Sequence, residues 1–341
     1  MPINYSGGFS QTVEELAEFE AAGLDIVSVA EAYSFDAVSQ LGFIAARTSR
    51  LEIASGILQL YTRTPTLTAM TAAGLDFVSG GRFSLGLGAS GPQVIEGFHG
   101  VPYDAPLGRT REIVEICRKV WRREPVIFDG AHYQVPLPEG KGTGLGKPLK
   151  LINRPVRDRI PIILAAIGPR NVALAAEVAE GWQPIFFHPE RAAEAWGRSL
   201  AEGAAKRDPE LGPLDVMASV AFAITEHPTP FLQGYREQLA LYIGGMGARG
   251  RNFYNDLARR YGYESEASTI QDLYLSGRKE EAAAAVPEDL VRDTSLVGPL
   301  GYVRERVAAF AVAGVTTLHV TALAPTHEER VRSIEQLRDL M

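Results

Sequence analysis

Short runs of consecutive apolar residues recur along the chain, and each follows an amphipathic segment that ends in glycine. The runs lie within EAAGLDIVSV (20–29), DFVSGGRFSLGLG (76–88), EVAEGWQPIFF (177–187) and AVAGVTTLHVTA (311–322). Glycine closes helices in the left-handed conformation, and the residues predicted in this role are Gly23, Gly80, Gly181 and Gly314. An uninterrupted apolar run is typical of a strand buried on both faces of a parallel sheet. The repeated pattern therefore predicts successive βα units.

The predicted strands number eight, at residues 2–6, 25–29, 51–56, 82–87, 160–165, 182–186, 214–224 and 316–321. Eight such units fit a closed (β/α)8 TIM barrel better than an open sheet, because no dinucleotide-binding half stands out. The expected fold is thus an α/β TIM barrel that forms a single domain over residues 1–341. Two stretches interrupt the alternation of strands and helices and are predicted to be insertions. One, at 124–160, is rich in proline and glycine, and the other, at 244–290, is polar and helical.

Two helices can be interpreted in more detail. Thr12 and Glu15 match a capping box, which predicts a helix that opens at Thr12 and ends before Gly23. In REIVEICRKVWRR (111–123), apolar residues recur at helical spacing and form one stripe. Cys117 lies in that stripe and is the only cysteine, which predicts a core thiol and leaves no disulfide or cysteine metal cluster.

Charge and composition narrow the possible partners. The formal net charge is −7 and the basic residues are scattered, which argues against nucleic acid or an anionic membrane surface. The first residues, MPINYSGGFS, lack the features of a signal peptide, and no uncharged apolar stretch approaches the length of a membrane span. We therefore expect a cytoplasmic protein that acts on a small molecule, with no metal site.

A glycine run at 84–100, SLGLGASGPQVIEGFHG, contains the spacing G-x-G-x-x-G at Gly86, Gly88 and Gly91. In a dinucleotide-binding fold this spacing needs a helix whose first N–H groups meet a pyrophosphate. Here Pro92 and further glycines follow at once, and they are expected to prevent a first helical turn. A nicotinamide dinucleotide site is therefore not predicted, and the glycines need another role.

Small residues occupy most of the predicted strand tips, which is where a TIM barrel binds its ligands. The tips are Tyr5-Ser6-Gly7, Ala30-Glu31-Ala32-Tyr33, Ser55-Gly56-Ile57, Gly88-Ala89-Ser90-Gly91, Ala165-Ala166-Ile167-Gly168 and Phe186-Phe187-His188. Small side chains allow a flat ring to approach the backbone closely. Tight turns without a ligand are the alternative, but several such tips on one face favour a planar ligand.

The segment AAIGPRNVALAAEVAEG (165–181) combines a strand end with the start of a helix. Gly168 frees the backbone, Pro169 suits the first helical position, and Arg170 lies in the first turn. Helix N–H groups beside a guanidinium form an anion site suited to phosphate. The alternative is a well-capped helix with a solvated arginine.

Four segments together resemble the bacterial luciferase-like (LLM) superfamily, and in particular its actinobacterial coenzyme F420-dependent oxidoreductases. They are IASGILQLYTRTP, GGRFSLGLGASGPQVIEGFHG, AAIGPRNVALAAEVAEGW and SLVGPLGYVRERVAAFAVAGV. The similarity runs in the same order over essentially the whole chain. It implies a (β/α)8 barrel that binds a flavin or deazaflavin at the carboxyl-terminal mouth.

The resemblance also implies roles for single residues. The tip Ser55-Gly56-Ile57 would form a bulge behind the central ring, with a non-prolyl cis peptide at Gly56–Ile57. Gly88, Ala89 and Ser90 would contact the ring edge or the polar tail. The residues that would hold the cofactor's phosphate are Ala165, Ala166, Gly168, Pro169 and Arg170.

Two departures separate this chain from the family's sugar-phosphate dehydrogenases. Those enzymes place an Asp-His pair where Glu31-Ala32 stands here, and an acid where Pro92-Gln93 stands, which argues against glucose-6-phosphate oxidation. The candidates for proton handling are Glu31, Tyr33 and Glu96, which could instead satisfy loop backbone groups. His99 and His188 are expected to be packing or surface residues.

The resulting hypothesis is hydride transfer between C5 of coenzyme F420 and a small, apolar organic substrate, in either direction. With FMN the same pocket would instead support a monooxygenase. A non-catalytic protein that binds flavin or F420 is the second alternative. Exposed barrel helices favour a homodimer or a higher homo-oligomer.

Overall fold

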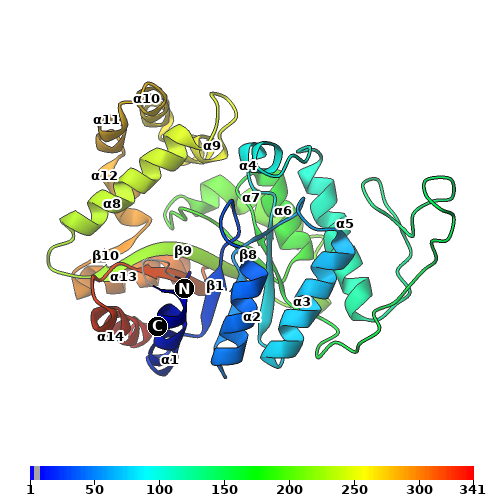
Figure 1. The fold of residues 1–341 in the computed structure, drawn as a ribbon. Helices are drawn as coiled ribbons and strands as arrows, with labels where there is room; N and C mark the ends of the chain where they lie inside the picture. Colours follow the sequence, from blue (N-terminus) through cyan, green and yellow to red (C-terminus); the bar gives the residue numbers. More distant parts are fainter. Residues whose placement is uncertain (4–7) are drawn as a thin grey trace.

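The computed structural model describes residues 1–3 and 8–341 and shows a curled parallel sheet surrounded by helices (Figure 1). The sheet follows the order β1 (Ile26–Val29), β2 (Glu52–Ser55), β4 (Phe83–Gly88), β7 (Ile162–Ala165), β8 (Gly181–Gln183) and β9 (Asp215–Ile224). Three strands pair in parallel beside this path: β3 (Leu58–Gln59) with β4, and β10 (Leu296–Gly298) and β11 (Thr317–Ala322) with β9. The predicted α/β fold of TIM-barrel type is confirmed, although β10 was not predicted.

The first strand of the predicted barrel is only partly described. Pro2 pairs in parallel with Ser28 of β1, so the chain start lies along β1. The rest of the predicted strand at 2–6, with the tip Tyr5-Ser6-Gly7, lies outside the described residues. Ser28 Oγ is 2.8 Å from Nε2 of His319 in β11, so the sheet curls far enough to bring its first and last parts together.

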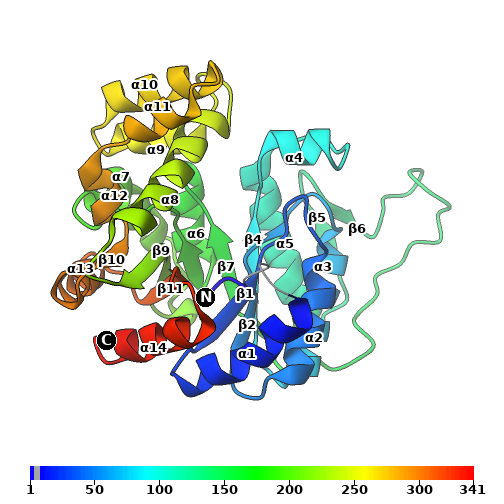
Figure 2. The same cartoon turned by 60° about the vertical axis from the view of Figure 1, so that its left-hand side comes forward.

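Helices cover the outer face of the sheet (Figures 1 and 2). They are α1 (Phe9–Ala21), α2 (Ala37–Arg47), α3 (Pro65–Ser79), α5 (Pro106–Trp121), α6 (Pro169–Val178), α7 (Ala192–Ala204), α13 (Leu300–Val312) and α14 (His327–Arg338). The predicted apolar stripe of α5 is buried, and Cys117 is fully enclosed in it. Burial raises the pKa of the Cys117 thiol to about 12, so the prediction of a core thiol is confirmed.

Three of the four predicted helix-closing glycines have positive φ, namely Gly23, Gly80 and Gly314. The prediction for Gly181 is wrong, because α6 ends at Val178 and Gly181 begins β8. A Cβ at Gly181 would lie 3.2 Å from the Ile163 side chain. This glycine therefore serves close packing between neighbouring strands.

The predicted capping box at Thr12 is also wrong. Helix α1 begins at Phe9 with Gly8 as its N-cap, and the Thr12 N–H donates to the Gly8 carbonyl over 3.0 Å. Phe9, Ser10 and Gln11 are all compatible with helix, so nothing in this segment delays the start until Thr12.

The segment 124–160 extends away from the sheet as a long loop with a short hairpin, β5 (Phe128–Asp129) and β6 (Gln134–Val135) (Figures 1 and 2). The end of this segment is anchored by Arg157, which forms an ion pair with Asp76 of α3. Asp76 is completely buried.

A helical segment stands over one side of the strand ends (Figure 2). It comprises α8 (Thr229–Ala240), the π-helical turn η2 (Leu241–Gly245), α9 (Phe253–Arg260), α10 (Glu264–Leu275), α11 (Lys279–Ala284) and α12 (Glu288–Asp293). It begins before the predicted boundary at 244. None of the helices in the described part of the chain is long and apolar enough to cross a membrane.

Candidate cofactor site

A bulge at the end of β2 is the most specific feature of the carboxyl edge of the sheet. The peptide bond Gly56–Ile57 is cis, as the resemblance implied. The Ser55 hydroxyl donates to the Gly86 carbonyl and accepts from the Gly86 N–H, both over 2.9 Å. Because Ser55 is buried and its hydroxyl both donates to and accepts from Gly86, it positions the bulge.

Three predicted ligand positions from three strands converge beside this bulge. A Cβ built on Gly88 would lie 3.1 Å from the Ile57 side chain and 3.5 Å from Cβ of Ala165. Gly88 thus allows the bulge and the neighbouring strand to pack closely against its own strand. Ser90, two residues after Gly88, has a φ of 59°. Such a φ is uncommon for a residue other than glycine and frequent at ligand sites.

The amino terminus of α6 lies one strand further along the edge. Gly168 is its N-cap and Pro169 occupies the first turn, as predicted. Arg170 is exposed, and its side chain makes no hydrogen bond or ion pair with the residues that the structure describes. Free N–H groups of the first turn beside an uncommitted guanidinium can bind phosphate.

The loop that leads into α6 is fixed by side chains that sequence reasoning did not single out. The indole N–H of Trp182 donates to the Ala166 carbonyl over 2.9 Å, and that of Trp196 to the Ile167 carbonyl over 3.0 Å. Arg260 of α9 also donates to Ile167, over 2.9 Å. The long separation in sequence left no signal for the contact of Arg260.

Glu31, a proton-handling candidate, is bound on both carboxylate oxygens. Arg63 forms a two-pronged ion pair with it, with Nη2 3.0 Å from Oε2, and the Ala37 N–H donates to Oε2 over 3.1 Å. The ion pair raises the pKa of Arg63. These contacts favour the alternative left open by the sequence, a carboxylate that anchors the loop after β1.

The other two candidates lie at the open mouth. Tyr33 is 68% exposed and its ring centroid is 6.3 Å from that of Phe98. Glu96 is exposed and accepts from the Tyr103 N–H over 3.2 Å. Neither side chain is enclosed, so neither has the burial that usually tunes a catalytic acid.

Glu96 belongs to α4 (Pro92–Gly97), a helix that the sequence was expected to forbid. That expectation is wrong. Pro92 occupies the first turn, where a backbone N–H has no acceptor within the helix, so a proline there loses no hydrogen bond. The fixed φ of proline also suits the helix. The helix has only six residues before Phe98 ends it.

His188 and His99 both pack against protein groups. His188 is buried, with Nδ1 3.1 Å from Glu190 and Nε2 3.9 Å from Asp293. Burial lowers the pKa of His188. A His-Glu-Asp trio is a conceivable cation site, but Arg306 already binds both oxygens of Glu190 and supplies the positive charge. His99 packs edge-on against a neighbouring phenylalanine ring.

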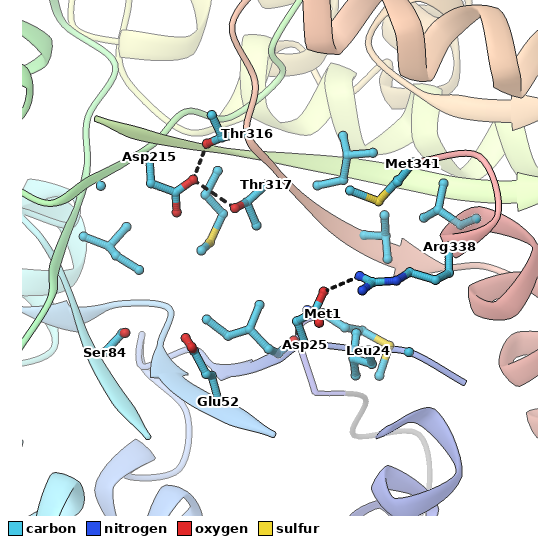
Figure 3. A pocket seen from close by; sticks show the side chains of 18 of the residues that line it. Met1, Leu24, Asp25, Glu52, Ser84, Asp215, Thr316, Thr317, Arg338 and Met341 are labelled. Carbon is cyan, nitrogen blue, oxygen red and sulfur yellow. Dashed lines mark hydrogen bonds and ion pairs between the residues drawn. The ribbon is translucent and has the colours of Figure 1, made fainter. Parts of the chain in front are cut away.

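A cavity of about 400 Å³ lies at the opposite end of the strands (Figure 3). It is lined by residues that begin strands, among them Glu52 and Asp215. Asp215 accepts from the hydroxyls of Thr316 and Thr317, and Arg338 pairs with Asp25 over 3.0 Å. Since this cavity faces away from the strand tips, it is separate from the candidate cofactor site.

The chain is similar to known proteins over most of its length. The family model for luciferase-like monooxygenases matches residues 2–317. A Mycobacterium tuberculosis protein named as a coenzyme F420-dependent oxidoreductase is 45% identical over 332 residues, which cover 96% of this chain and 92% of the relative. The 5,10-methylenetetrahydromethanopterin reductase of Archaeoglobus fulgidus is 27% identical, with 93% and 90% covered.

Solved structures show the same fold. The coenzyme F420-dependent tetrahydromethanopterin reductase of Methanopyrus kandleri superposes with a TM-score of 0.81 at 21% identity, over 100% of this chain and 98% of that one. An F420-dependent secondary alcohol dehydrogenase superposes with a TM-score of 0.71 at 17% identity, over 98% and 95% of the two chains.

Proposed function

This chain belongs to the luciferase-like monooxygenase family, and we propose that, as an oxidoreductase with coenzyme F420, it transfers hydride between C5 of the deazaflavin and a small, apolar organic substrate. The observation that carries the proposal is the wall at the carboxyl edge of the sheet, where Gly88 lies close to the bulge at Ile57 and to Ala165. A flat tricyclic ring needs such a wall without bulky side chains.

The residues present fit this cofactor in two places. Gly56, Ile57 and Gly88 would support the ring, with Ala89 and Ser90 at its edge. The phosphate would lie against the amino terminus of α6, among Ala165, Ala166, Gly168, Pro169 and Arg170. The uncommitted guanidinium of Arg170 provides the charge that a phosphate requires.

When bound, coenzyme F420 supplies a carbon that donates or accepts hydride. The protein's own residues position the cofactor. The Ser55–Gly86 hydrogen bonds fix the bulge that orients one ring face, and the indole N–H groups fix the phosphate loop. Glu31, paired with Arg63, holds the loop after β1 at the rim.

Titration of the cofactor-free protein with F420 and, separately, with FMN tests the assignment. We expect saturable binding of F420 and much weaker binding of FMN. Tight binding of FMN with no response to F420 would instead support the monooxygenase. Firm F420 binding without turnover in a broad screen, followed by the visible absorbance of the cofactor, would support a non-catalytic binding protein.

We further propose that the protein is a homodimer that associates through α3. This barrel helix exposes Leu67, Met70, Phe77 and Val78, which lie on one stripe with Gly74 between them. An exposed apolar stripe of this kind marks an interaction surface.

A charge in the middle of the stripe is expected to disrupt that dimer. Met70→Asp would bury a carboxylate in the interface and should convert the dimer to monomer at micromolar concentration. Light scattering after size-exclusion chromatography measures the mass. Val312→Asp, on an exposed site of α13, is the control and should remain dimeric. A wild-type monomer, or a Met70→Asp dimer, would contradict the proposal.

A further inference from the structure

The cavity at the amino-terminal end of the strands has room for a small organic molecule (Figure 3). This amino-terminal cavity has a volume of about 400 Å³, which lies within the range of small-molecule sites. Its lining includes the first residues of β1, β2, β8, β9 and β11. A ligand bound there would lie at the opposite end of the strands from the candidate cofactor site and would not compete for it.

Strand register places the polar part of the lining on one face of the sheet. In a parallel sheet, paired residues share a face, and so do residues two apart in one strand. Such relations join Glu52 of β2 to Asp215 of β9, through the pairs Ala54–Ser84, Gly86–Ile163, Ile163–Gly181 and Gly181–Asp215. Because the sheet curls, Glu52 and Asp215 lie on opposite sides of the cavity, with Ser84 on the side of Glu52 (Figure 3).

Ser84 supplies an unused polar group to the cavity. Only 6% of the residue is exposed, and its hydroxyl makes no hydrogen bond to any of the residues that the structure describes. Buried hydroxyls are normally hydrogen-bonded. Ser84 lines the cavity together with Glu52, so its hydroxyl is available to a ligand there.

The basic groups around the cavity leave its charge uncompensated. Arg338 is the one arginine or lysine among the described lining residues, and it pairs with Asp25 over 3.0 Å. The amino group of Met1 is buried, which lowers its pKa to about 5, so it adds no charge near neutral pH. Arg157 lies outside the lining in an ion pair with α3, and it does not prevent burial from raising the pKa of Glu52.

Two carboxylates of the lining, those of Glu52 and Asp215, have no cationic partner in the described part of the chain. Glu52 makes no hydrogen bond or ion pair there, and Asp215 accepts only from threonine hydroxyls. By contrast, the carboxylate of Glu180 is bound by Arg118 and Arg159, at 3.1 and 3.0 Å. The acidic side of the cavity, lined by Glu52, Ser84 and Asp215, therefore holds negative charge that a bound cation would balance.

The rest of the lining is mostly aliphatic. It includes side chains from the turn before β1, from β11 and from α14, namely Leu24, Leu318, Val320, Ile334 and Leu337. Figure 3 shows Leu24 and Met341 at the end of the cavity away from Ser84. The amino-terminal cavity thus combines an acidic side with an aliphatic side, which matches a ligand that has a cationic head and a hydrocarbon chain.

We propose that the amino-terminal cavity binds an aliphatic amine, with its ammonium group on the acidic side and its carbon chain on the aliphatic side. An ammonium group carries three donors, which suit the carboxylates and the Ser84 hydroxyl. Hydrogen bonds between ionised groups are stronger than neutral ones. A carboxylate ligand would instead add negative charge beside Glu52 and Asp215. This site is independent of the proposed function.

Three six-carbon probes test the charge preference. Isothermal titration calorimetry of the full-length protein at neutral pH, with and without F420, would compare hexylamine with 1-hexanol and hexanoate. We expect hexylamine to bind about tenfold or more tightly than 1-hexanol, and hexanoate to show no saturable binding. F420 should leave the affinity for hexylamine unchanged, because the two sites lie at opposite ends of the strands.

Two substitutions assign the binding to this cavity. Glu52→Gln keeps the size of the side chain and should weaken hexylamine about tenfold or more, while 1-hexanol changes by less than about twofold. Ser84→Ala should weaken hexylamine about threefold. Glu139→Gln, in the exposed loop 124–160, is the matched control and should bind hexylamine as wild type does. If Glu52→Gln unfolds at a lower urea concentration than wild type, Ser84→Ala decides.

Several results would overturn the amine site. They are hexylamine binding no tighter than that of 1-hexanol, a loss in Glu139→Gln as large as that in Glu52→Gln, and binding that neither Glu52→Gln nor Ser84→Ala weakens. Displacement of hexylamine by F420 would also overturn it, because the amine would then occupy the cofactor site. Failure to bind F420 would contradict the proposed function alone, and the hexylamine titrations would still decide the amine site.

Discussion

Replacing Gly86 by alanine should destabilise the folded protein by about 3 kcal/mol or more. A Cβ at this position would lie 1.8 Å from the Ser55 carbonyl oxygen. That oxygen is backbone and cannot rotate away as a side chain would. Relief therefore requires β2 and β4 to separate, with loss of both Ser55–Gly86 hydrogen bonds and of the bulge.

Urea unfolding followed by circular dichroism measures this effect, and soluble yield gives a second readout. Gly42→Ala in α2 is the matched control, because a Cβ there meets nothing within 4 Å and alanine favours helix by up to about 1 kcal/mol. Equal urea midpoints for Gly86→Ala and wild type would contradict the expectation that a Cβ at this position forces β2 and β4 apart.

Arg170→Ala should weaken F420 binding roughly 10- to 150-fold, which corresponds to about 1.5–3 kcal/mol for a hydrogen bond to a charged group. The side chain has no partner among the described residues, so its loss should leave the unfolding midpoint unchanged. The defect would thus belong to binding and not to folding. Added salt should narrow the difference, because it screens an exposed charge pair.

Fluorescence titration with F420 measures the affinities. Arg198→Ala removes an arginine that is 92% exposed on α7 and, among the described residues, pairs only with Glu202, and it should bind F420 as wild type does. An Arg170→Ala protein with unaltered affinity would remove this residue from the site.

The sequence was most informative where a local pattern has one structural outcome. Buried strands follow closing glycines at Gly23, Gly80 and Gly314, and that repetition was enough to predict the TIM-barrel type of fold. The cis peptide at Gly56–Ile57 followed from the resemblance. Errors arose where two local rules compete. Proline disrupts the interior of a helix but is favoured in the first turn, and Pro92 lies in the first turn of α4.

Contacts across long separations could not be predicted. The Arg63 partner of Glu31 is 32 residues away, and Arg260 reaches Ile167 across 93 residues. The polar helices around η2 carry no pattern that shows which side chains face the strand ends. The contact of Tyr242 with Phe186 was missed for this reason, because only the tertiary fold brings the two rings together.

The helices that stand over one side of the strand ends have an evolutionary consequence. The candidate cofactor site is built by strands of the sheet itself, around Ile57 and Gly88, whereas Tyr242 and Tyr254 come from a stretch that interrupts the strand–helix alternation. The proposed cofactor site and the added helices are thus encoded by separate portions of the gene. A change confined to the second portion would leave the strands that form the proposed cofactor site in place.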